Sequence, residues 1–324
     1  MKKILSVILT ATLILSFCSC AGNTENTGDD GKKLNIVTTV FPVYDWVRNI
    51  LGENEDVKLT MLLDSGVDLH SFQPTADDIM EISACDLFIY VGGESDEWVE
   101  DALKQSQNDD LKAVSLMDEL GESVKEEELK DGMEAEAQEG GAPEEKEYDE
   151  HIWLSLKNAR LLCEKICRVI TEKDKENENT YSENLKSYCD KLSLLDTEYQ
   201  NAVNAGTKKT LLFADRFPFR YLTDDYGLDY FAAFKGCSAE SEASFETVTF
   251  LAKKVDELNL NCVLQIDGTQ NNIAKTVVES TKSKNQKILS VNSMQSVTSG
   301  DVENGADYYN IMEKNLSVFK EALV

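Results

Sequence analysis

Short apolar segments alternate with amphipathic segments along this chain, and this pattern limits its fold more than any other feature. The first half holds four segments typical of strands: Leu34–Thr39, Val57–Leu63, Asp86–Val91 and Lys112–Leu116. Strands that are apolar along their length are typical of parallel sheets covered by helices on both faces. Segments with helical spacing lie between them, such as Tyr44–Leu51, which Gly52 closes. The pattern predicts an α/β fold.

The second half of the chain repeats the beginning of the first half. Thr210–Tyr221 has the same form as Leu34–Tyr44: an apolar strand, a polar residue, Phe-Pro and an aromatic helix start. A predicted helix from Tyr181 to about Val203 would be roughly 35 Å long, enough to join two domains rigidly. The roughly 290 residues after the N-terminal segment also exceed what one core usually supports. We therefore expect two similar lobes, each a mainly parallel sheet flanked by helices, joined by one long rigid helix.

The N-terminal residues predict export and a lipid anchor. Lys2 and Lys3 precede an apolar run from Ile4 to Phe17, which is typical of a signal peptide and too short for a membrane span. Cys20 follows Ser19 in the lipobox pattern of bacterial lipoproteins. Lipidation of Cys20 would hold the protein outside the cytoplasm at the cell membrane, and plain secretion is the alternative. The predicted parts are a signal peptide (1–19), a flexible tether (20–33), an N-terminal lobe (34–177), a connecting helix (178–205) and a C-terminal lobe (206–324).

Composition excludes one class of partner. The net charge of −28 opposes binding to nucleic acid, whose phosphates would repel the chain, and is compatible with attracting cations. Within the N-terminal lobe, residues 119–150 hold fourteen acidic residues and three lysines. Such a segment indicates a mobile, solvated acidic loop, or alternatively a surface that collects cations beside a site. The eight cysteines do not form a dense disulfide framework for an exported chain of this size.

The chain contains only two histidines, His70 and His151. Both lie where an apolar segment meets a polar or helical one, and neutral imidazole is the commonest protein ligand for first-row transition metals. Ordinary loop or capping histidines are the alternative. Ligands of parallel sheets bind beyond the carboxyl ends of the strands. His70, Asp215 and Asp267 are all predicted to lie at such ends.

Two segments of the chain resemble a known family. Gly66–Asp77 resembles the first metal-ligand loop of the zinc- and manganese-binding lipoproteins of bacterial ABC importers, the cluster A-I solute-binding proteins, and Asp149–Asn158 resembles their second ligand motif. Further matches are Thr38–Trp46, Gly92–Trp98 and Gly236–Ser244. The resemblance implies a metal ion in the cleft between the lobes and delivery of that ion to a membrane permease. The ligands that it implies are His70, His151, Asp215 and Asp267.

The chain departs from the family pattern at several of these positions. Glu150 replaces a proline that usually precedes the second histidine, and Asp215 replaces a third histidine of the zinc-binding branch. Asp215 has the alternative role of a cap or of a partner for Arg216 or Arg220, and Asp267 that of a turn residue. Two imidazoles and two carboxylates suit Zn²⁺, and they also suit Mn²⁺ because oxygen ligands favour harder ions. We expect Zn²⁺, with Mn²⁺ as the alternative.

The predicted function is therefore capture of a divalent metal by a monomeric solute-binding lipoprotein that serves an ABC permease, without enzymatic activity. A metal hydrolase is a second class, but the chain lacks a His-Glu-x-x-His motif, and four protein ligands leave no open position for an activated water. A surface adhesin or interaction protein with a structural metal is a third class. In that case the acidic loop would be the contact surface.

Overall fold

The computed structural model describes residues 33–134, 146–238 and 242–324. The predicted signal peptide, Cys20 and nearly all of the predicted tether lie outside these residues. Residues 33–324 form one compact unit. Within the described part of the chain, every helix is too short or too polar to cross a membrane.

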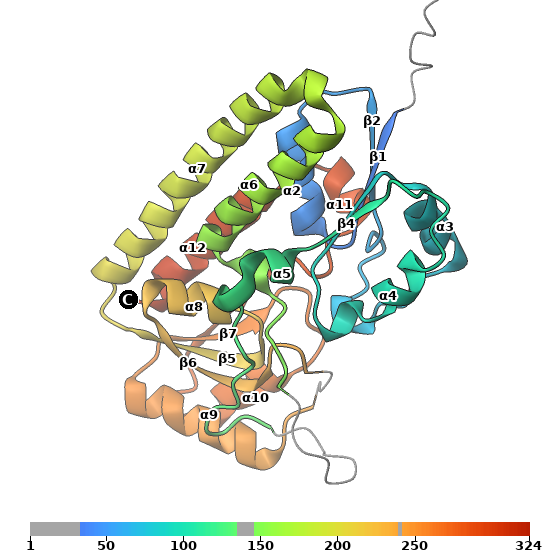
Figure 1. Ribbon diagram of the computed structural model, residues 1–324. Helices are drawn as coiled ribbons and strands as arrows, with labels where there is room; N and C mark the ends of the chain where they lie inside the picture. Colours follow the sequence, from blue (N-terminus) through green and yellow to red (C-terminus); the bar gives the residue numbers. More distant parts are fainter. Residues whose placement is uncertain (1–32, 135–145, 239–241) are drawn as a thin grey trace, which may run out of the picture. The chain divides into compact units, whose positions relative to one another are not determined.

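The core consists of two parallel sheets of four strands each, which Figure 1 shows in different parts of the unit. The first sheet has the order β2-β1-β3-β4 and the second β6-β5-β7-β8. The strands are β1 (Leu34–Thr38), β2 (Val57–Met61), β3 (Leu87–Tyr90), β4 (Lys112–Ser115), β5 (Thr210–Phe217), β6 (Asp229–Lys235), β7 (Cys262–Ile266) and β8 (Lys287–Val291). Numbered within its own half, each sheet has the order 2-1-3-4. The predicted α/β class and the repeated halves are confirmed.

Helices flank both sheets. Those of the first half are α2 (Phe41–Leu51), α3 (Ala76–Ala84), α4 (Trp98–Leu103), α5 (Leu116–Leu120) and α6 (Leu156–Lys173). Those that follow are α7 (Glu178–Ala205), α8 (Arg220–Tyr226), α9 (Phe245–Leu258), α10 (Ile273–Ser280), α11 (Ser299–Glu303) and α12 (Tyr308–Ala322). Short 3₁₀ turns complete the chain, and two of them, η1 (Leu69–Ser71) and η4 (Ile152–Leu154), lie beside the histidines.

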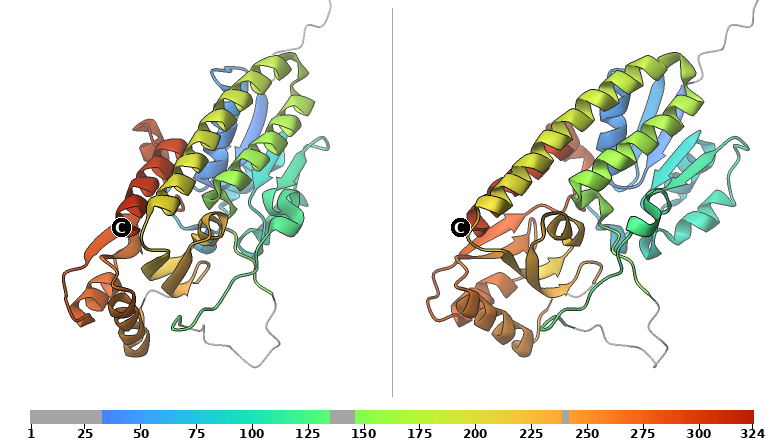
Figure 2. Two further views of the ribbon diagram at one scale, coloured as in Figure 1. Left: turned by 90° about the vertical axis from the view of Figure 1, so that its left-hand side faces the viewer. Right: turned by 60° about the vertical axis from the view of Figure 1, so that its left-hand side comes forward.

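The long helix α7 has 28 residues and would be about 42 Å long at the standard rise. It packs against α2, α6 and α12, which lie along it in Figure 2. Its buried side chains recur every three to seven residues on one face: Tyr181, Tyr188, Leu192, Leu195, Tyr199 and Val203. One hydrophobic cluster includes these residues and residues of both sheets. Because this core is continuous, the lobe boundaries given above stay a prediction.

The segment 119–150 differs from the solvated loop that its composition indicates. Its described residues lie against the second sheet: Glu134 N donates to Ala233 O (2.9 Å), and Lys130 pairs with Asp229 (2.6 Å). The side chain of Met133 is buried. Acidic side chains of the segment also meet the second half, which composition alone does not reveal: Glu147 pairs with Lys235, and the backbone N–H groups of Cys237 and Ser244 donate to Glu127 and Glu134. Residues 135–145 of this segment lie outside the described residues.

Candidate metal centre

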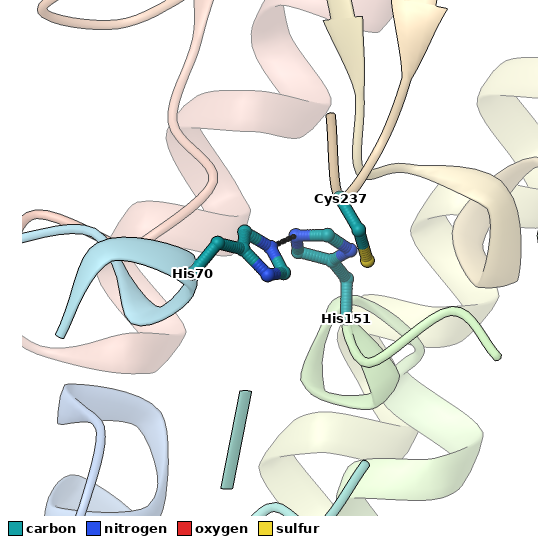
Figure 3. A group of neighbouring side chains, drawn as sticks. All are labelled: His70, His151 and Cys237. Atoms are coloured by element: carbon teal, nitrogen blue, oxygen red, sulfur yellow. Dashed lines mark hydrogen bonds between the residues drawn. The ribbon is translucent and has the colours of Figure 1, made fainter. Parts of the chain in front are cut away.

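The two histidines lie side by side although 81 residues separate them in sequence. His70 lies in η1, after the edge strand β2, and His151 directly precedes η4. Their Nε2 atoms are 3.2 Å apart, as the dashed line in Figure 3 marks. The side chain of His151 is fully buried and that of His70 is 10% exposed. The fold therefore brings both sequence-predicted histidines into one buried site.

The hydrogen bonds at Nδ1 determine what the two facing nitrogens can do. Nδ1 of His151 lies 2.8 Å from Asp149 Oδ1, and Nδ1 of His70 lies 2.8 Å from Ser95 Oγ. A ring that donates from Nδ1 keeps a lone pair on Nε2. Two lone pairs at 3.2 Å repel each other unless a proton or cation lies between them. In tetrahedral zinc sites, Zn–N distances of 2.0–2.1 Å place two nitrogens about 3.3 Å apart. The spacing of the pair therefore fits a shared metal ion.

Burial also keeps the two imidazoles neutral. It lowers the pKa of His151 to about 4. Burial, together with the neighbouring His151, lowers the pKa of His70 to about 3. Neutral imidazole is the form that binds metal ions. At neutral pH a metal ion at this site would meet no competing imidazole protons.

Two buried carboxyl groups flank the histidine pair. Asp149 is fully buried and Glu150 is 2% exposed, and burial raises the pKa of each to about 7. Glu150 Oε2 lies 3.4 Å from His70 Nδ1. Among the described residues, no hydrogen-bond donor reaches Asp149 Oδ2 or Glu150 Oε2. A cation bound beside them would stabilise their charged forms, so these oxygens also favour a metal at this place.

A glycine makes room for Glu150. Gly93 has φ +83°, and a Cβ atom at this position would lie 2.4 Å from Glu150 Oε1. The same oxygen accepts a hydrogen bond from Ser95 N (2.8 Å). Gly93, beyond the end of β3, thus leaves the space that the Glu150 carboxyl group fills, and Ser95 N–H holds that group in place. The sequence indicated the glycines but not this role.

The structure places Asp215 and Asp267 differently from the histidines. Asp215 is buried in β5, at a register shift between Phe213 and Arg216, and its carboxylate accepts Arg216 N–H (2.9 Å) and Ile266 N–H (3.1 Å). Asp267 is exposed and accepts from Asn292 Nδ2 (3.2 Å). The described residues hold two groups whose potential ligand atoms lie within 4.8 Å of one another, and neither group contains Asp215 or Asp267. Their role as ligands stays a prediction.

The two groups contain residues that the sequence did not indicate as ligands. One group is His70, His151 and Cys237; the other is Glu127, Asp149 and His151. Cys237 follows β6, and its backbone N–H donates to Glu127 Oε1 (3.0 Å). A cysteine just beyond the carboxyl end of a predicted strand is the signal that could have indicated it. Glu127 gave no such signal because it stands within a long acidic segment.

An ion pair connects the loop of His70 to the second half of the chain. Arg216 donates to Asp68 Oδ2 (2.7 Å), and Asp68 Oδ1 accepts the backbone N–H of His70 (3.1 Å). Arg216 also donates to the backbone carbonyl of Ser238 (3.3 Å). Arg216 thus joins the segments that carry His70 and Cys237, which come from different sheets.

Replacing Asp149 by asparagine is expected to weaken zinc binding by about 10- to 100-fold, the usual effect of removing a carboxylate that orients a metal-binding histidine. The amide keeps an acceptor for His151 but loses the negative charge. Competition with a chromophoric zinc chelator would measure the change. The matched control is Asp190→Asn on the exposed face of α7, where the carboxylate pairs with Lys186. An equal affinity in Asp149→Asn and Asp190→Asn would contradict this role.

Two α/β halves of one topology, with a buried pair of histidines beside loops from both, define the class of two-lobed α/β binding proteins. A family model described as the periplasmic zinc-uptake complex component A matches residues 36–322. The chain belongs to this family, and the resemblance seen in its two histidine motifs is confirmed.

Relatives from Streptococcus and Bacillus are similar along nearly the whole chain. The zinc-binding lipoprotein AdcA of Streptococcus pneumoniae is 29% identical over 99% of this chain, which spans only 61% of that relative's length. The high-affinity zinc uptake system protein ZnuA of Bacillus subtilis is 27% identical over 99% of this chain and 97% of its own length.

Solved structures share the fold. The Zn(II)-bound ZnuA-like domain of S. pneumoniae AdcA superposes with a TM-score of 0.70 at 26% identity and covers 90% of this chain and 99% of that domain. The metal-dependent lipoprotein YcdH of B. subtilis gives a TM-score of 0.72 at 26% identity, over 90% of this chain and 99% of its own. The predicted two-lobed α/β architecture therefore agrees with known structures of the family.

Proposed function

We propose that this protein is a solute-binding protein that captures Zn²⁺ outside the cytoplasm and delivers it to an ABC importer. The observation that carries the proposal is the buried pair of neutral imidazoles whose Nε2 atoms face each other at 3.2 Å. Membership of the zinc-uptake family supports it, as do the names of the relatives. The zinc ion is cargo here, so its binding must be tight yet reversible.

His70 and His151 are the proposed ligands with the most direct support, because they already have ligand spacing. Asp215 and Asp267 remain proposed on the resemblance alone. In favour of Asp215 is its burial in β5, at the register shift close to the carboxyl end of the strand. To bind the ion, the Asp215 carboxylate would have to give up its hydrogen bonds from the N–H groups of Arg216 and Ile266.

Zinc is favoured over manganese as the cargo. Imidazole nitrogen suits zinc, and the order of stability for divalent ions places Zn²⁺ well above Mn²⁺ at such a site. The acidic groups Asp149 and Glu150 add negative charge but do not discriminate between the two ions. Manganese remains the alternative if further oxygen ligands complete the site.

The remaining parts of the proposal concern location and partners. We place the protein at the outer face of the cell membrane through a lipid on Cys20, as a monomer that docks on the permease of the importer. The lipobox pattern and the lipoprotein names of relatives support the anchor. The family's role in zinc uptake implies no chemical conversion, and we propose that the protein is not an enzyme. Zinc-dependent hydrolysis of ester, phosphate or peptide substrates by the purified protein would contradict this point.

The experiment that tests the function is metal analysis followed by competition. The purified protein is expected to hold about one zinc per chain by mass spectrometry, and a 100-fold excess of Mn²⁺ should leave that zinc in place because zinc lies higher in the stability order. Repeating the competition in Asp215→His tests the third ligand. If the wild type instead binds Mn²⁺ as strongly as Zn²⁺, and Asp215→His loses this Mn²⁺ binding, then manganese is the cargo. A protein that binds neither ion would refute the proposal.

A further inference from the structure

We propose that Cys237 supplies a third donor, a thiolate, to the metal ion held by His70 and His151. This inference rests on the function proposed above and specifies the chemistry of its site. It gives the cargo two nitrogen donors and one sulfur donor, a set that takes zinc and other thiophilic divalent ions such as Co²⁺ and Cd²⁺.

The first argument is proximity. One potential ligand atom from each of His70, His151 and Cys237 lies within 4.8 Å of those of the other two. Figure 3 shows the cysteine side chain beside the ring of His151, with His70 on the opposite side of that ring. Donors of a tetrahedral zinc site lie about 3.3–3.6 Å apart, given Zn–N near 2.0 Å and Zn–S near 2.3 Å. Because the 4.8 Å limit exceeds this spacing by about 1.2–1.5 Å, a closure of up to that size brings the three donors to ligand spacing.

The second argument is the symmetry of the two halves. His70 follows β2, the edge strand of the first sheet, and Cys237 follows β6, the edge strand of the second sheet. These two strands hold the same place in the order 2-1-3-4. The carboxyl-end segments of equivalent strands thus face each other across His151, each with a residue capable of binding a metal.

The third argument is the local backbone. A Cβ atom at Gly236 would lie 2.9 Å from Phe217 O, 3.1 Å from Glu127 Oε1 and 3.2 Å from His151 Cε1. Only a residue without a side chain lets this segment approach the imidazole so closely. Glu127 then fixes the backbone by accepting the N–H of Cys237 (3.0 Å). Cys237 is consequently held next to the histidine ring rather than placed there by a flexible loop.

The fourth argument is the charge around the site. Glu150, 2% exposed, directs Oε2 to within 3.4 Å of the His70 ring, and this oxygen has no hydrogen-bond partner among the described residues. A buried carboxylate oxygen without a donor is costly unless a positive charge lies nearby. A divalent ion between the histidines and Cys237 supplies that charge. The thiolate in turn lowers the net charge of the bound ion, so that the buried site is closer to neutral.

Binding exchanges one bond for another at sulfur. The S–H bond of Cys237 breaks, the S–Zn bond forms, and the proton passes to solvent; no electrons are transferred. Burial raises the pKa of the Cys237 thiol well above its usual range, so the metal-free protein carries the proton that the ion displaces. A sulfur donor would also favour Zn²⁺ over Mn²⁺, because thiolates favour Zn²⁺ and oxygen ligands favour Mn²⁺.

The test uses Co²⁺ as a spectroscopic substitute for zinc, with the full protein kept under reducing conditions. Thiolate coordination to Co²⁺ gives a charge-transfer band in the near ultraviolet. We expect this band in the wild type, its loss in Cys237→Ser, and its retention in the matched control Cys189→Ser, which changes a half-buried cysteine on α7. X-ray absorption at the zinc edge should likewise show one Zn–S distance near 2.3 Å in the wild type and none in Cys237→Ser.

The outcomes separate this inference from the proposed function. Cobalt binding without a thiolate band, or a band that survives in Cys237→Ser, would overturn the role of Cys237 and leave metal capture by the histidines intact. Failure of the wild type to bind either Co²⁺ or Zn²⁺ would overturn both. Where the cobalt band is lost in Cys237→Ser, the zinc affinity of that variant should also fall by about 100-fold. This loss is close to the contribution of one ligand to the binding free energy of a four-ligand zinc site.

Discussion

His70→Ala and His151→Ala are each expected to weaken zinc binding by more than about 100-fold, because four-ligand structural zinc sites bind with roughly 10–16 kcal/mol, or about 3 kcal/mol per ligand. Each substitution also removes one of the two nitrogens that face each other at 3.2 Å. In His151→Ala the fully buried Asp149 loses the ring that it orients. We therefore expect His151→Ala to have the larger effect.

Competition against a zinc chelator of known affinity would measure these losses. The double variant should bind more weakly than either single variant, although by less than the product of the two effects, since both side chains are proposed to bind the same ion. Phe245→Ala, which removes an aromatic ring that is 86% exposed, is the matched control and should bind zinc normally. Circular dichroism would verify that each variant is folded. Folded variants that bind zinc with wild-type affinity would show that neither histidine is a ligand and that both are ordinary loop or capping residues.

Trp153→Ala is expected to lower the free energy of unfolding by about 3–5 kcal/mol, the usual cost of truncating a large buried side chain. Trp153 is fully buried next to His151, with the two ring centroids 5.3 Å apart. Its Nε1 donates to Ser293 O (2.9 Å), 140 residues along the chain, and its own carbonyl accepts from Tyr308 Oη (2.6 Å). The substitution leaves a cavity beside the histidine pair and removes the donor to Ser293.

Urea unfolding of the metal-free protein would measure this loss. Trp153→Phe is the informative comparison, because it keeps most of the apolar surface and loses the hydrogen bond, for an expected cost of about 1–2 kcal/mol. A loss of unfolding free energy below about 1 kcal/mol in Trp153→Ala would lie well under the usual range for such truncations. It would show that the residue does not couple the segments around the site. Zinc added in excess should raise the free energy of unfolding of both proteins, since ligand binding stabilises the folded state, and leave their difference unchanged where both bind zinc equally.

Local pattern and length were enough to predict much of the fold. The strand segments, the repeated halves and a long helix after residue 177 follow from apolar periodicity and from the Phe-Pro repeats, which depend on neighbours along the chain. The scarcity of histidine and the two motifs around His70 and His151 indicated the centre of the site. These features are encoded within a few residues of each position, so the sequence reveals them without knowledge of the contacts.

Other features of the site depend on residues far apart in sequence. Asp215 reads as a strand-end ligand, yet the register shift in β5 turns its carboxylate toward the N–H of Ile266, 51 residues away. From the sequence alone Cys237 is an ordinary cysteine, and only the position of β6 in the fold places it beside His151. Its partner Glu127, 110 residues away, is one of many acidic residues in its segment. No local pattern distinguishes a carboxylate that will be buried from one that will remain in solvent.

The sequence by itself therefore determined the class of fold, the family and the two histidines, because periodicity, motif and composition are local properties. The tertiary structure alone decided which groups from distant segments lie beside them: it brings Cys237 and Glu127 to His151 and fixes Asp215 in β5 by the N–H of Ile266. The physical reason is that a ligand set is defined by distances of a few ångströms between segments. Those distances arise only when two sheets, their edge strands and the long helix pack into one core.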